Sequence, residues 1–302
     1  MKEPTQDRRR PGRARRLVAL LGAALVLLVV LAGTNTLRNK AGIAITDDTP
    51  AERRALLEPF WRMVGTDAAP SPPVEGAAAL LMSGCDGPHD NMDYWGEVLA
   101  GAGRPALVVD SHGPRGLGEF DLWRLVCAGQ ILPGAERAGD VAVALAATRA
   151  PRVTLLGASH GGWTVMELMA HLATGDAPPG LTAWPAPPAD LARRIDRVVP
   201  LYPYCGALNG AKAGDWSAAP PILMVLGSED RVISTPDCTA MAEALRRRGA
   251  DIRVMELPGI DHGFDQAERS ALSPLRLVPE AREATRRAVL GSRRTPARGR
   301  RG

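Results

Sequence analysis

Six apolar runs of strand length alternate with helical patterns through most of the chain. The apolar runs occupy positions 77–82, 105–110, 152–157, 197–202, 221–227 and 251–257. Helical periodicity is found at 91–102, 134–149, 160–173, 236–248 and 280–290. Strands that are nearly continuously apolar and separated by helices are typical of a parallel sheet covered on both faces. We therefore predict an α/β domain with a mostly parallel sheet flanked by helices.

The third apolar run ends in a turn of the G-x-S-x-G type, formed by Gly157 to Gly161. A strand, this turn and a helix describe a nucleophile elbow, in which the glycines relieve crowding and Ser159 projects outward. The backbone N–H of His160, at the helix N-terminus, then faces a developing oxyanion. Taken alone, the pentapeptide is also compatible with an ordinary turn in which Ser159 caps the helix.

An acid and a histidine follow two later strands. The fifth apolar run leads into Glu229 and Asp230, and the sixth leads into a loop with His262. The carboxyl ends of parallel strands meet at one edge of a sheet, and the order Ser, Asp, His is that of the α/β-hydrolase arrangement. We predict Ser159 as nucleophile, His262 as general base and Asp230 as the acid that orients it, with Glu229 as the alternative acid.

A second oxyanion donor is expected from the Gly-rich turn Ser83 to Pro88, which follows the first apolar run. By its place in the chain, the backbone N–H of Cys85 pairs with that of His160. A triad with these donors needs no metal and no organic cofactor. His89, Asp90 and Asp93 lack a third strong ligand motif, and we predict no metal site there.

These residues together resemble the dienelactone-hydrolase-like branch of the α/β-hydrolase superfamily. The resemblance covers roughly 75–290, and its most specific piece is the segment Asp110-Ser111-His112-Gly113-Pro114-Arg115-Gly116. It implies the α/β-hydrolase fold and a hydrolase. Two departures matter: position 159 is serine rather than the cysteine of the dienelactone hydrolases proper, which argues against dienelactone as substrate, and Ser83 replaces a histidine of many relatives.

Two residues of that segment are candidates for binding substrate. Arg115 could meet an anionic group of the substrate, since a guanidinium matches a carboxylate, or it could tie down its own loop. His112 could line the pocket or be satisfied within the loop. The sequence leaves both alternatives open.

The N-terminal region predicts a membrane anchor. Residues 17–37 carry no charge and are long enough to span a bilayer. The basic residues of 1–16, against only Arg38 and Lys40 beyond the span, place the N-terminus in the cytoplasm. We favour an uncleaved signal-anchor over a cleaved signal peptide, because no Ala-x-Ala site stands out. In both cases the body lies outside the cytoplasm, and the alternative product is a secreted protein.

Cysteine content agrees with export. The even number suggests up to two disulfides with three possible pairings, or alternatively buried free thiols. None of the cysteines has the spacing of a metal site. The four cysteines are Cys85, Cys127, Cys205 and Cys238.

The net charge of +4 comes from the two ends of the chain. Residues 1–16 and 291–302 each carry +5, which leaves 17–290 at −6. A nucleic-acid role for the folded domain is therefore not expected. The predicted organisation is a basic cytoplasmic tail (1–16), a transmembrane signal-anchor (17–37), a juxtamembrane connector (38–73), an α/β-hydrolase domain (74–290) and a disordered basic tail (291–302).

The Pro-rich segment 176–188 interrupts the strand–helix alternation and is expected to form either part of a cap or a plain surface loop. The predicted function is hydrolysis of an ester or related acyl bond of a small molecule through an acyl-enzyme on Ser159. The alternatives are a peptidase or acyltransferase with the same triad, and a catalytically silent binding domain at the membrane. Oligomeric state is not predicted.

Overall fold

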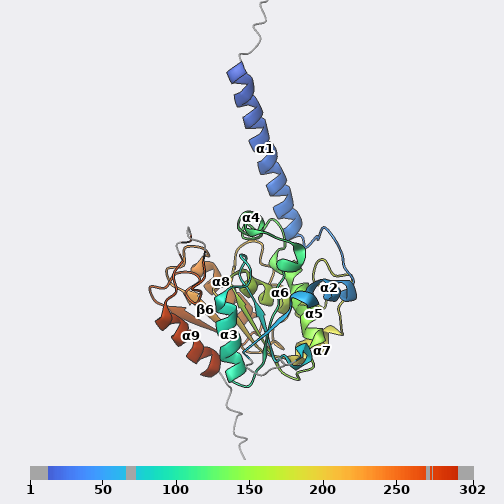
Figure 1. The fold of residues 1–302 in the computed structure, drawn as a ribbon, viewed down its shortest axis with the longest axis vertical. Coiled ribbons are helices and arrows are strands. Elements are labelled where there is room, and N and C mark those ends of the chain that lie inside the picture. Colours follow the sequence, from blue (N-terminus) through green and yellow to red (C-terminus); the bar gives the residue numbers. More distant parts are fainter. Residues whose placement is uncertain (1–12, 66–72, 270–272, 274, 292–302) are drawn as a thin grey trace, which may run out of the picture.

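The computed structural model of the protein describes residues 13–65, 73–269, 273 and 275–291. A long helix, α1 (Arg13–Lys40), projects from an α/β body (Figure 1). Its segment Arg15–Lys40 contains an 18-residue window with a mean hydropathy of 2.7 and is long and apolar enough to cross a membrane. The apolar N-terminal helix expected from the sequence is therefore present. Predictions for 1–12 and 292–302 lie outside the described residues.

The body is built on a seven-stranded sheet of order β1-β3-β2-β4-β5-β6-β7. Neighbouring strands are parallel, except that β1 is antiparallel to β3. All six strands expected from the apolar runs are present, which confirms the predicted mostly parallel sheet. The strands are β1 (Arg62–Val64), β2 (Ala79–Met82), β3 (Ala106–Val108), β4 (Val153–Ala158), β5 (Ile195–Leu201), β6 (Ile222–Gly227) and β7 (Ile252–Leu257).

Helices cover both faces of this sheet, as predicted. Buried residues of α5, α6 and α8 pack against one face, and those of α3 and α9 pack against the other. The α-helices after α1 are α2 (Pro50–Leu57), α3 (Asp90–Gly101), α4 (Glu119–Asp121), α5 (Gly134–Ala147), α6 (His160–Thr174), α7 (Pro188–Arg194), α8 (Thr235–Arg247) and α9 (Pro279–Gly291). Short 3₁₀ turns are η1 (Glu58–Phe60), η2 (Val74–Gly76) and η3 (Gly113–Arg115), and η4 (Leu122–Val126) is a π-helical turn that continues α4.

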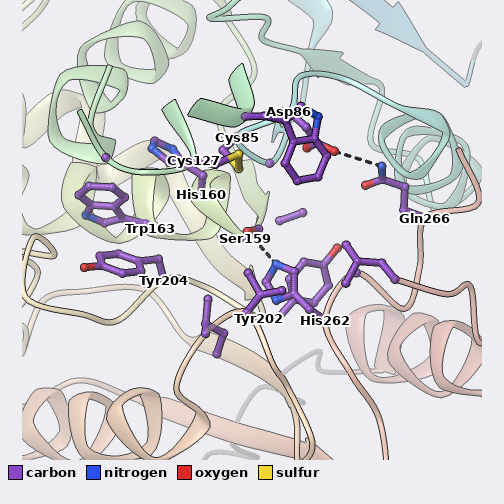
Figure 2. Close-up of a pocket in the computed structure, with 18 of the residues that line it drawn as sticks. Cys85, Asp86, Cys127, Ser159, His160, Trp163, Tyr202, Tyr204, His262 and Gln266 are labelled. Carbon is purple, nitrogen blue, oxygen red and sulfur yellow. Dashed lines mark hydrogen bonds between the residues drawn. A yellow bond between two sulfur atoms is a disulfide. The ribbon is translucent and has the colours of Figure 1, made fainter. Parts of the chain in front are cut away.

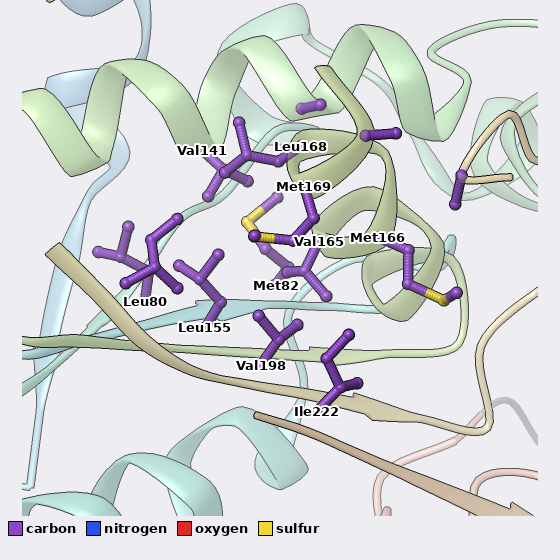
Figure 3. Packing of buried hydrophobic residues seen from close by; sticks show 14 of the residues in the cluster. Leu80, Met82, Val141, Leu155, Val165, Met166, Leu168, Met169, Val198 and Ile222 are labelled. Atoms are coloured by element: carbon purple, nitrogen blue, oxygen red, sulfur yellow. The ribbon is translucent and has the colours of Figure 1, made fainter. Parts of the chain in front are cut away.

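The strand that leads to Ser159 lies at the centre of the sheet. β4 is hydrogen-bonded between β2 and β5, and all six of its residues are buried. Leu155 of β4 packs in one cluster with Val165 of α6 and Val198 of β5 (Figure 3). A strand buried on both faces and paired on both edges holds its carboxyl end in one place, so the residue that follows it is firmly positioned.

Part of the predicted connector, 38–73, is built into the body. A capping box of Thr49 and Glu52 starts α2. The α2 residue Arg53 is buried, and its guanidinium donates to Asp140 of α5 at 2.7 Å. After α2, β1 adds an edge strand next to β3. The sequence indicated only a short amphipathic stretch here, because a three-residue strand and a buried arginine leave little pattern.

The Pro-rich segment 176–188 packs against this connector. The carbonyl of Gly180 accepts a hydrogen bond from Arg53 Nη2 at 2.8 Å, and Leu181 forms a β-bridge with Asp48. None of the segment's residues lines the main cavity described below. The structure thus shows a packed surface loop rather than a cap.

Two disulfides join parts of the body that are distant in sequence. The pairs are Cys85–Cys127 and Cys205–Cys238, with Cα atoms 5.0 Å and 5.1 Å apart. Of the three pairings that the sequence left open, the structure contains this one. The first pair ties the loop after β2 to the turn after η4, and the second ties the loop after β5 to α8.

Candidate active site

Ser159 occupies the sharp turn between β4 and α6 in a strained backbone conformation. Its φ of 52° and ψ of −113° lie outside the regions that non-glycine residues ordinarily adopt. The flanking glycines make the turn possible: a Cβ on Gly157 would lie 2.1 Å from the carbonyl oxygen of Gly161, and one on Gly161 would lie 2.1 Å from that of Met82. This geometry is that of a nucleophile elbow, with the serine side chain projecting from the edge of the sheet.

His262 and Asp230 reach this serine from the ends of β7 and β6. His262 Nε2 lies 2.9 Å from Ser159 Oγ (Figure 2). His262 Nδ1 lies 2.7 Å from Asp230 Oδ2. Both side chains are buried. Glu229, the alternative acid, is exposed to solvent. The structure therefore brings together the three residues that the sequence singled out and leaves the fourth outside.

The orientation of Asp230 is fixed by the backbone. Its Oδ1 accepts hydrogen bonds from the N–H groups of Val232 and Ile233, at 2.9 Å and 2.8 Å. Its other oxygen is thereby aimed at the imidazole of His262. The ring of Tyr202 contacts the same imidazole edge-on, with centroids 4.6 Å apart. These contacts hold His262 in one orientation toward Ser159.

The expected oxyanion loop lies next to the serine. Cys85 and His160, whose backbone N–H groups were predicted as donors, both line the cavity around Ser159. A Cβ on Gly84 would lie 3.8 Å from the Cβ of Ser159. The disulfide from Cys85 to Cys127 fastens this loop from its outer side.

A buried arginine that the sequence did not reveal contacts the expected oxyanion loop. Arg137 of α5 is completely buried. Its Nη2 donates to the carbonyl of Ser83 at 3.1 Å, and its Nη1 lies 2.9 Å from His160 Nδ1 and 3.5 Å from the carbonyl of Gly84. One guanidinium thus contacts both the loop of Cys85 and the residue that follows Ser159.

The protonation states of Arg137 and His160 are compatible with a hydrogen bond between them. Burial lowers the pKa of Arg137 to about 10, so the guanidinium stays cationic at neutral pH. Burial, and then the nearby Arg137 charge, lower the pKa of His160 well below 6.5. His160 is therefore neutral, and its Nδ1 can accept the hydrogen bond that Arg137 donates.

Arg115 and His112 are the candidate substrate contacts predicted from the sequence. Arg115 donates to the carbonyl of Ser111 at 2.7 Å and forms an ion pair with the buried Asp140 at 3.0 Å. His112 is buried beside its own loop residue Asp110. Neither residue lines the cavity. The structure thus shows Arg115 tied to its own loop and to Asp140, one of the two alternatives that the sequence left open, whereas neither ring nitrogen of His112 has a hydrogen-bond partner among the described residues.

The cavity above Ser159 has a volume of about 270 Å³. Four aromatic side chains contribute to its wall, and among the described residues that line it Asp86 is the only Asp, Glu, Lys or Arg (Figure 2). Asp86 is paired with His89, whose Nε2 lies 3.2 Å away, and with Gln266 at 3.4 Å. The aromatic residues are Trp123, Trp163, Tyr202 and Tyr204.

Glu167 lies behind this wall and titrates in an unusual range. Its Oε1 accepts hydrogen bonds from Trp163 Nε1 at 2.7 Å and from the backbone N–H of Gly210 at 2.6 Å. Burial raises the pKa of the Glu167 carboxyl from 4.5 to about 7. Because the folded state then binds this proton more tightly than the unfolded chain, ionisation of Glu167 costs stability as pH rises from 4.5 to about 7.

Replacement of Glu167 by glutamine should remove this cost. The Glu167→Gln variant keeps an acceptor for Trp163 Nε1 and cannot ionise. Its free energy of unfolding, relative to the wild type, is expected to rise by roughly 2–3 kcal/mol between pH 4.5 and pH 7.5. Urea unfolding of the full chain in detergent at both pH values measures this difference. A Glu243→Gln change at an exposed position of α8 is the control, and an equal difference at both pH values for Glu167→Gln would contradict the prediction.

Comparison with known proteins agrees with this fold. Residues 180–291 match the family model described as Dienelactone hydrolase family. That range contains Asp230 and His262 but begins after Ser159, so the family match does not include the nucleophile elbow. No curated protein sequence matches the chain. The family match confirms the predicted resemblance to dienelactone hydrolases over 180–291.

Solved structures with the same architecture include hydrolases of two bacteria. A Klebsiella pneumoniae protein provisionally assigned as a dienelactone hydrolase aligns with a TM-score of 0.55 and 17% identity, covering 76% of this chain and 96% of its own. Esterase 2 of Thermogutta terrifontis, phosphonylated by cyclosarin, aligns with a TM-score of 0.51 and 14% identity, covering 76% and 86%. Its butyrate-bound form aligns with a TM-score of 0.51 and 13% identity, covering 76% and 88%. At these identities the likeness establishes the α/β-hydrolase fold, as predicted.

Proposed function

We propose that this α/β-hydrolase, similar over 180–291 to the dienelactone hydrolase family, is an esterase-like serine hydrolase that cleaves acyl esters through Ser159. The observation that carries the proposal is the continuous chain of contacts from Asp230 through His262 to Ser159 at the floor of a cavity. A serine hydroxyl is a weak nucleophile until a base removes its proton, and this chain supplies the base. The esterase neighbours and the family match support the same class.

In the acylation step, Ser159 Oγ bonds to the acyl carbon while its proton passes to His262 Nε2. Asp230 stabilises the resulting imidazolium, and the backbone N–H groups of Cys85 and His160 bind the oxyanion. Collapse of the intermediate expels an alcohol, which takes the proton from His262. Water then repeats the sequence on the acyl-enzyme and releases the acid. No step calls for a metal or an organic cofactor.

The wall of the cavity favours an apolar, uncharged acyl ester. Aromatic and aliphatic side chains surround Ser159, and no lysine or arginine is among the described residues that line the cavity. A carboxylate-bearing substrate such as a dienelactone would lack a cationic partner there, and Ser159 replaces the cysteine of enzymes that open that ring. Both facts favour ester hydrolysis over dienelactone chemistry.

We place this activity outside the cytoplasm, with α1 as an uncleaved anchor. The apolar helix and the more strongly basic flank on its N-terminal side support this orientation. Two disulfides are characteristic of an oxidising compartment. A protease added to intact cells is expected to digest the body, whereas cleavage only after lysis would contradict this location.

A panel of chromogenic acyl esters and aminoacyl anilides, assayed with the full chain in detergent, tests the activity. Hydrolysis of the esters supports the proposal, and preferential hydrolysis of the anilides would assign a peptidase using the same triad. Faster release of the chromophore on adding an alcohol acceptor, with an ester as product, would assign an acyltransferase. No turnover of any compound would favour a silent binding domain and overturn the proposal.

Arg137 is expected to act as a positioning residue for the oxyanion loop. In Arg137→Met the carbonyls of Ser83 and Gly84 lose their donor, so the loop of Cys85 can shift. A shift of about 1 Å can cost on the order of 100-fold in rate, and we expect kcat to fall by about 10- to 100-fold with little change in KM. Arg137→Lys should recover part of the loss, because an ammonium can still donate to one carbonyl. Equal effects of both variants on Tm with unchanged kcat would contradict this role.

A further inference from the structure

The C-terminal end of α1 is joined directly to the catalytic body. Asn39 Nδ2 donates to the carbonyl of Gly129 at 2.8 Å, and Gln130 Nε2 donates to Thr36 Oγ1 at 3.0 Å. Asn35 Nδ2 lies 3.2 Å from Gln130 Oε1. Thr36 and Asn35 fall within the uncharged stretch 17–37 that is long enough to span a bilayer. No spacer therefore separates the span from the body at this point (Figure 1).

This junction fixes the depth at which the body meets the membrane. From Asn35 to Lys40 the helix rises about 7.5 Å, at 1.5 Å per residue. The polar interface on each side of a bilayer is about 5–7 Å thick. A body that contacts the helix at Asn35 must therefore present that contact surface at the level of the lipid headgroups.

The neighbouring segment carries exposed aromatic side chains. In α4 and η4, Phe120 is 71% exposed and Trp123 is 42% exposed. They are three positions apart on one helical turn, and the guanidinium of Arg124 lies 5.8 Å from the centre of the Phe120 ring. In Figure 1 α4 is drawn near the base of α1, and the turn that follows η4 is hydrogen-bonded to α1 through Gly129 and Gln130. Exposed aromatics next to an arginine are typical of helices that lie in a membrane interface.

The same segment forms one wall of the cavity. Trp123, Cys127 and Gly129 line it, and the disulfide from Cys127 reaches Cys85 on the oxyanion loop. Trp123 is thus both partly exposed beside the membrane helix and part of the wall above Ser159. The part of the cavity rim formed by this segment therefore belongs to the surface that α1 holds at the level of the lipid headgroups.

We propose that the segment from Phe120 to Gln130 rests in the interface of the bilayer that α1 crosses, and that the cavity takes apolar acyl esters from that bilayer. The proposal rests on the function proposed above, and it adds the membrane as the source of substrate. The Phe120 side chain inserts into the bilayer interface, and Trp123 lies at the rim of the cavity, between the lipid and Ser159. Arg124, with Arg38 and Lys40 at the end of α1, meets the anionic groups of lipid heads.

Depth-dependent quenching tests the position of this segment. All four cysteines of the chain are in disulfides, so Phe120→Cys and Arg193→Cys each provide one thiol for an environment-sensitive fluorophore. Arg193, on α7 at the end of the body opposite α1, is the control (Figure 1). The full-length variants are reconstituted in phosphatidylcholine vesicles that contain lipids spin-labelled near the headgroup. We expect quenching at position 120 to be at least threefold stronger than at position 193, and equal quenching would overturn the proposal.

An activity comparison tests the source of the substrate. Phe120 does not line the cavity, so Phe120→Ser should leave hydrolysis of a soluble short-chain ester unchanged within about twofold. The same variant should hydrolyse a long-chain ester dissolved in the vesicles about fivefold more slowly, because the segment loses its apolar contact with the bilayer. Equal rates of variant and wild type on the vesicle-borne ester would overturn uptake from the bilayer.

The quenching and activity experiments together distinguish failure of this proposal from failure of the esterase function on which it rests. Hydrolysis of the soluble ester without selective quenching at position 120 would reject the membrane-facing site and leave the esterase proposal standing. Selective quenching in a protein that hydrolyses neither ester would reject the esterase proposal, and with it the acyl substrate, while the segment's position in the membrane would stand.

Discussion

Replacing Ser159 with alanine is expected to lower kcat/KM for a soluble acyl ester by about 10⁴-fold or more. The hydroxyl is the one group at the end of β4 within hydrogen-bond distance of His262 Nε2, at 2.9 Å. Without it no acyl-enzyme can form, and the remaining groups can only assist direct attack by water. Initial-rate kinetics with the full chain in detergent measure the loss.

The matched control for this change is Ser217→Ala. Ser217 is an exposed serine whose hydroxyl contacts Asp215 and takes no part in the cavity. This variant should keep its kcat/KM within about twofold, since surface substitutions of this kind have little effect. Both variants should unfold cooperatively with similar Tm values. A Ser159→Ala enzyme that retains more than one tenth of the wild-type rate would contradict the assignment of the nucleophile.

Asp230→Asn should lower kcat by about 10⁴-fold, the loss that follows when a triad histidine is held in the wrong tautomer. Asp230 Oδ1 accepts two backbone hydrogen bonds, from Val232 and Ile233. An asparagine in its place keeps those bonds by presenting its carbonyl oxygen to them. Its NH₂ group then faces His262 Nδ1, which must act as an acceptor. Nε2 consequently carries the proton and can no longer act as a base toward Ser159.

Glu229→Gln separates this effect from a general loss of charge near the site. The neighbouring glutamate is exposed to solvent. Its neutralisation should change kcat by less than about twofold. If Glu229→Gln removed activity while Asp230→Asn retained it within about tenfold, the roles of the two acids would be reversed.

The fold could be predicted from the sequence because its central strands are buried on both faces. Runs such as 153–158 and 222–227 are nearly continuously apolar, and helical patterns separate them, which leaves few alternatives to a parallel sheet. The nucleophile elbow could also be predicted, because a Cβ at Gly157 or Gly161 would clash with the backbone, and glycines are therefore required at fixed positions around Ser159. Once the strands were placed, the parallel order brought Asp230 and His262 to the same edge.

Other features depended on contacts between distant segments, which local patterns do not contain. An arginine in a helical pattern ordinarily indicates a solvated face, so Arg137 gave no sign that it lies under the oxyanion loop. Arg115 was ambiguous because its partner, Asp140, lies on another helix. The pairing of the cysteines likewise needed the approach of η4 to the loop after β2. The edge strand β1 is too short to show a period of its own.

Covalent labelling by a fluorophosphonate tests the central claim most directly. Such a probe reacts with a serine only when a base has activated it and an oxyanion site accepts the phosphoryl oxygen. The account predicts that the wild-type chain gains one probe, that peptide mapping places it on Ser159, and that Ser159→Ala and Asp230→Asn lose the label. A wild-type protein that stays unlabelled, or a label that survives Ser159→Ala, would contradict it.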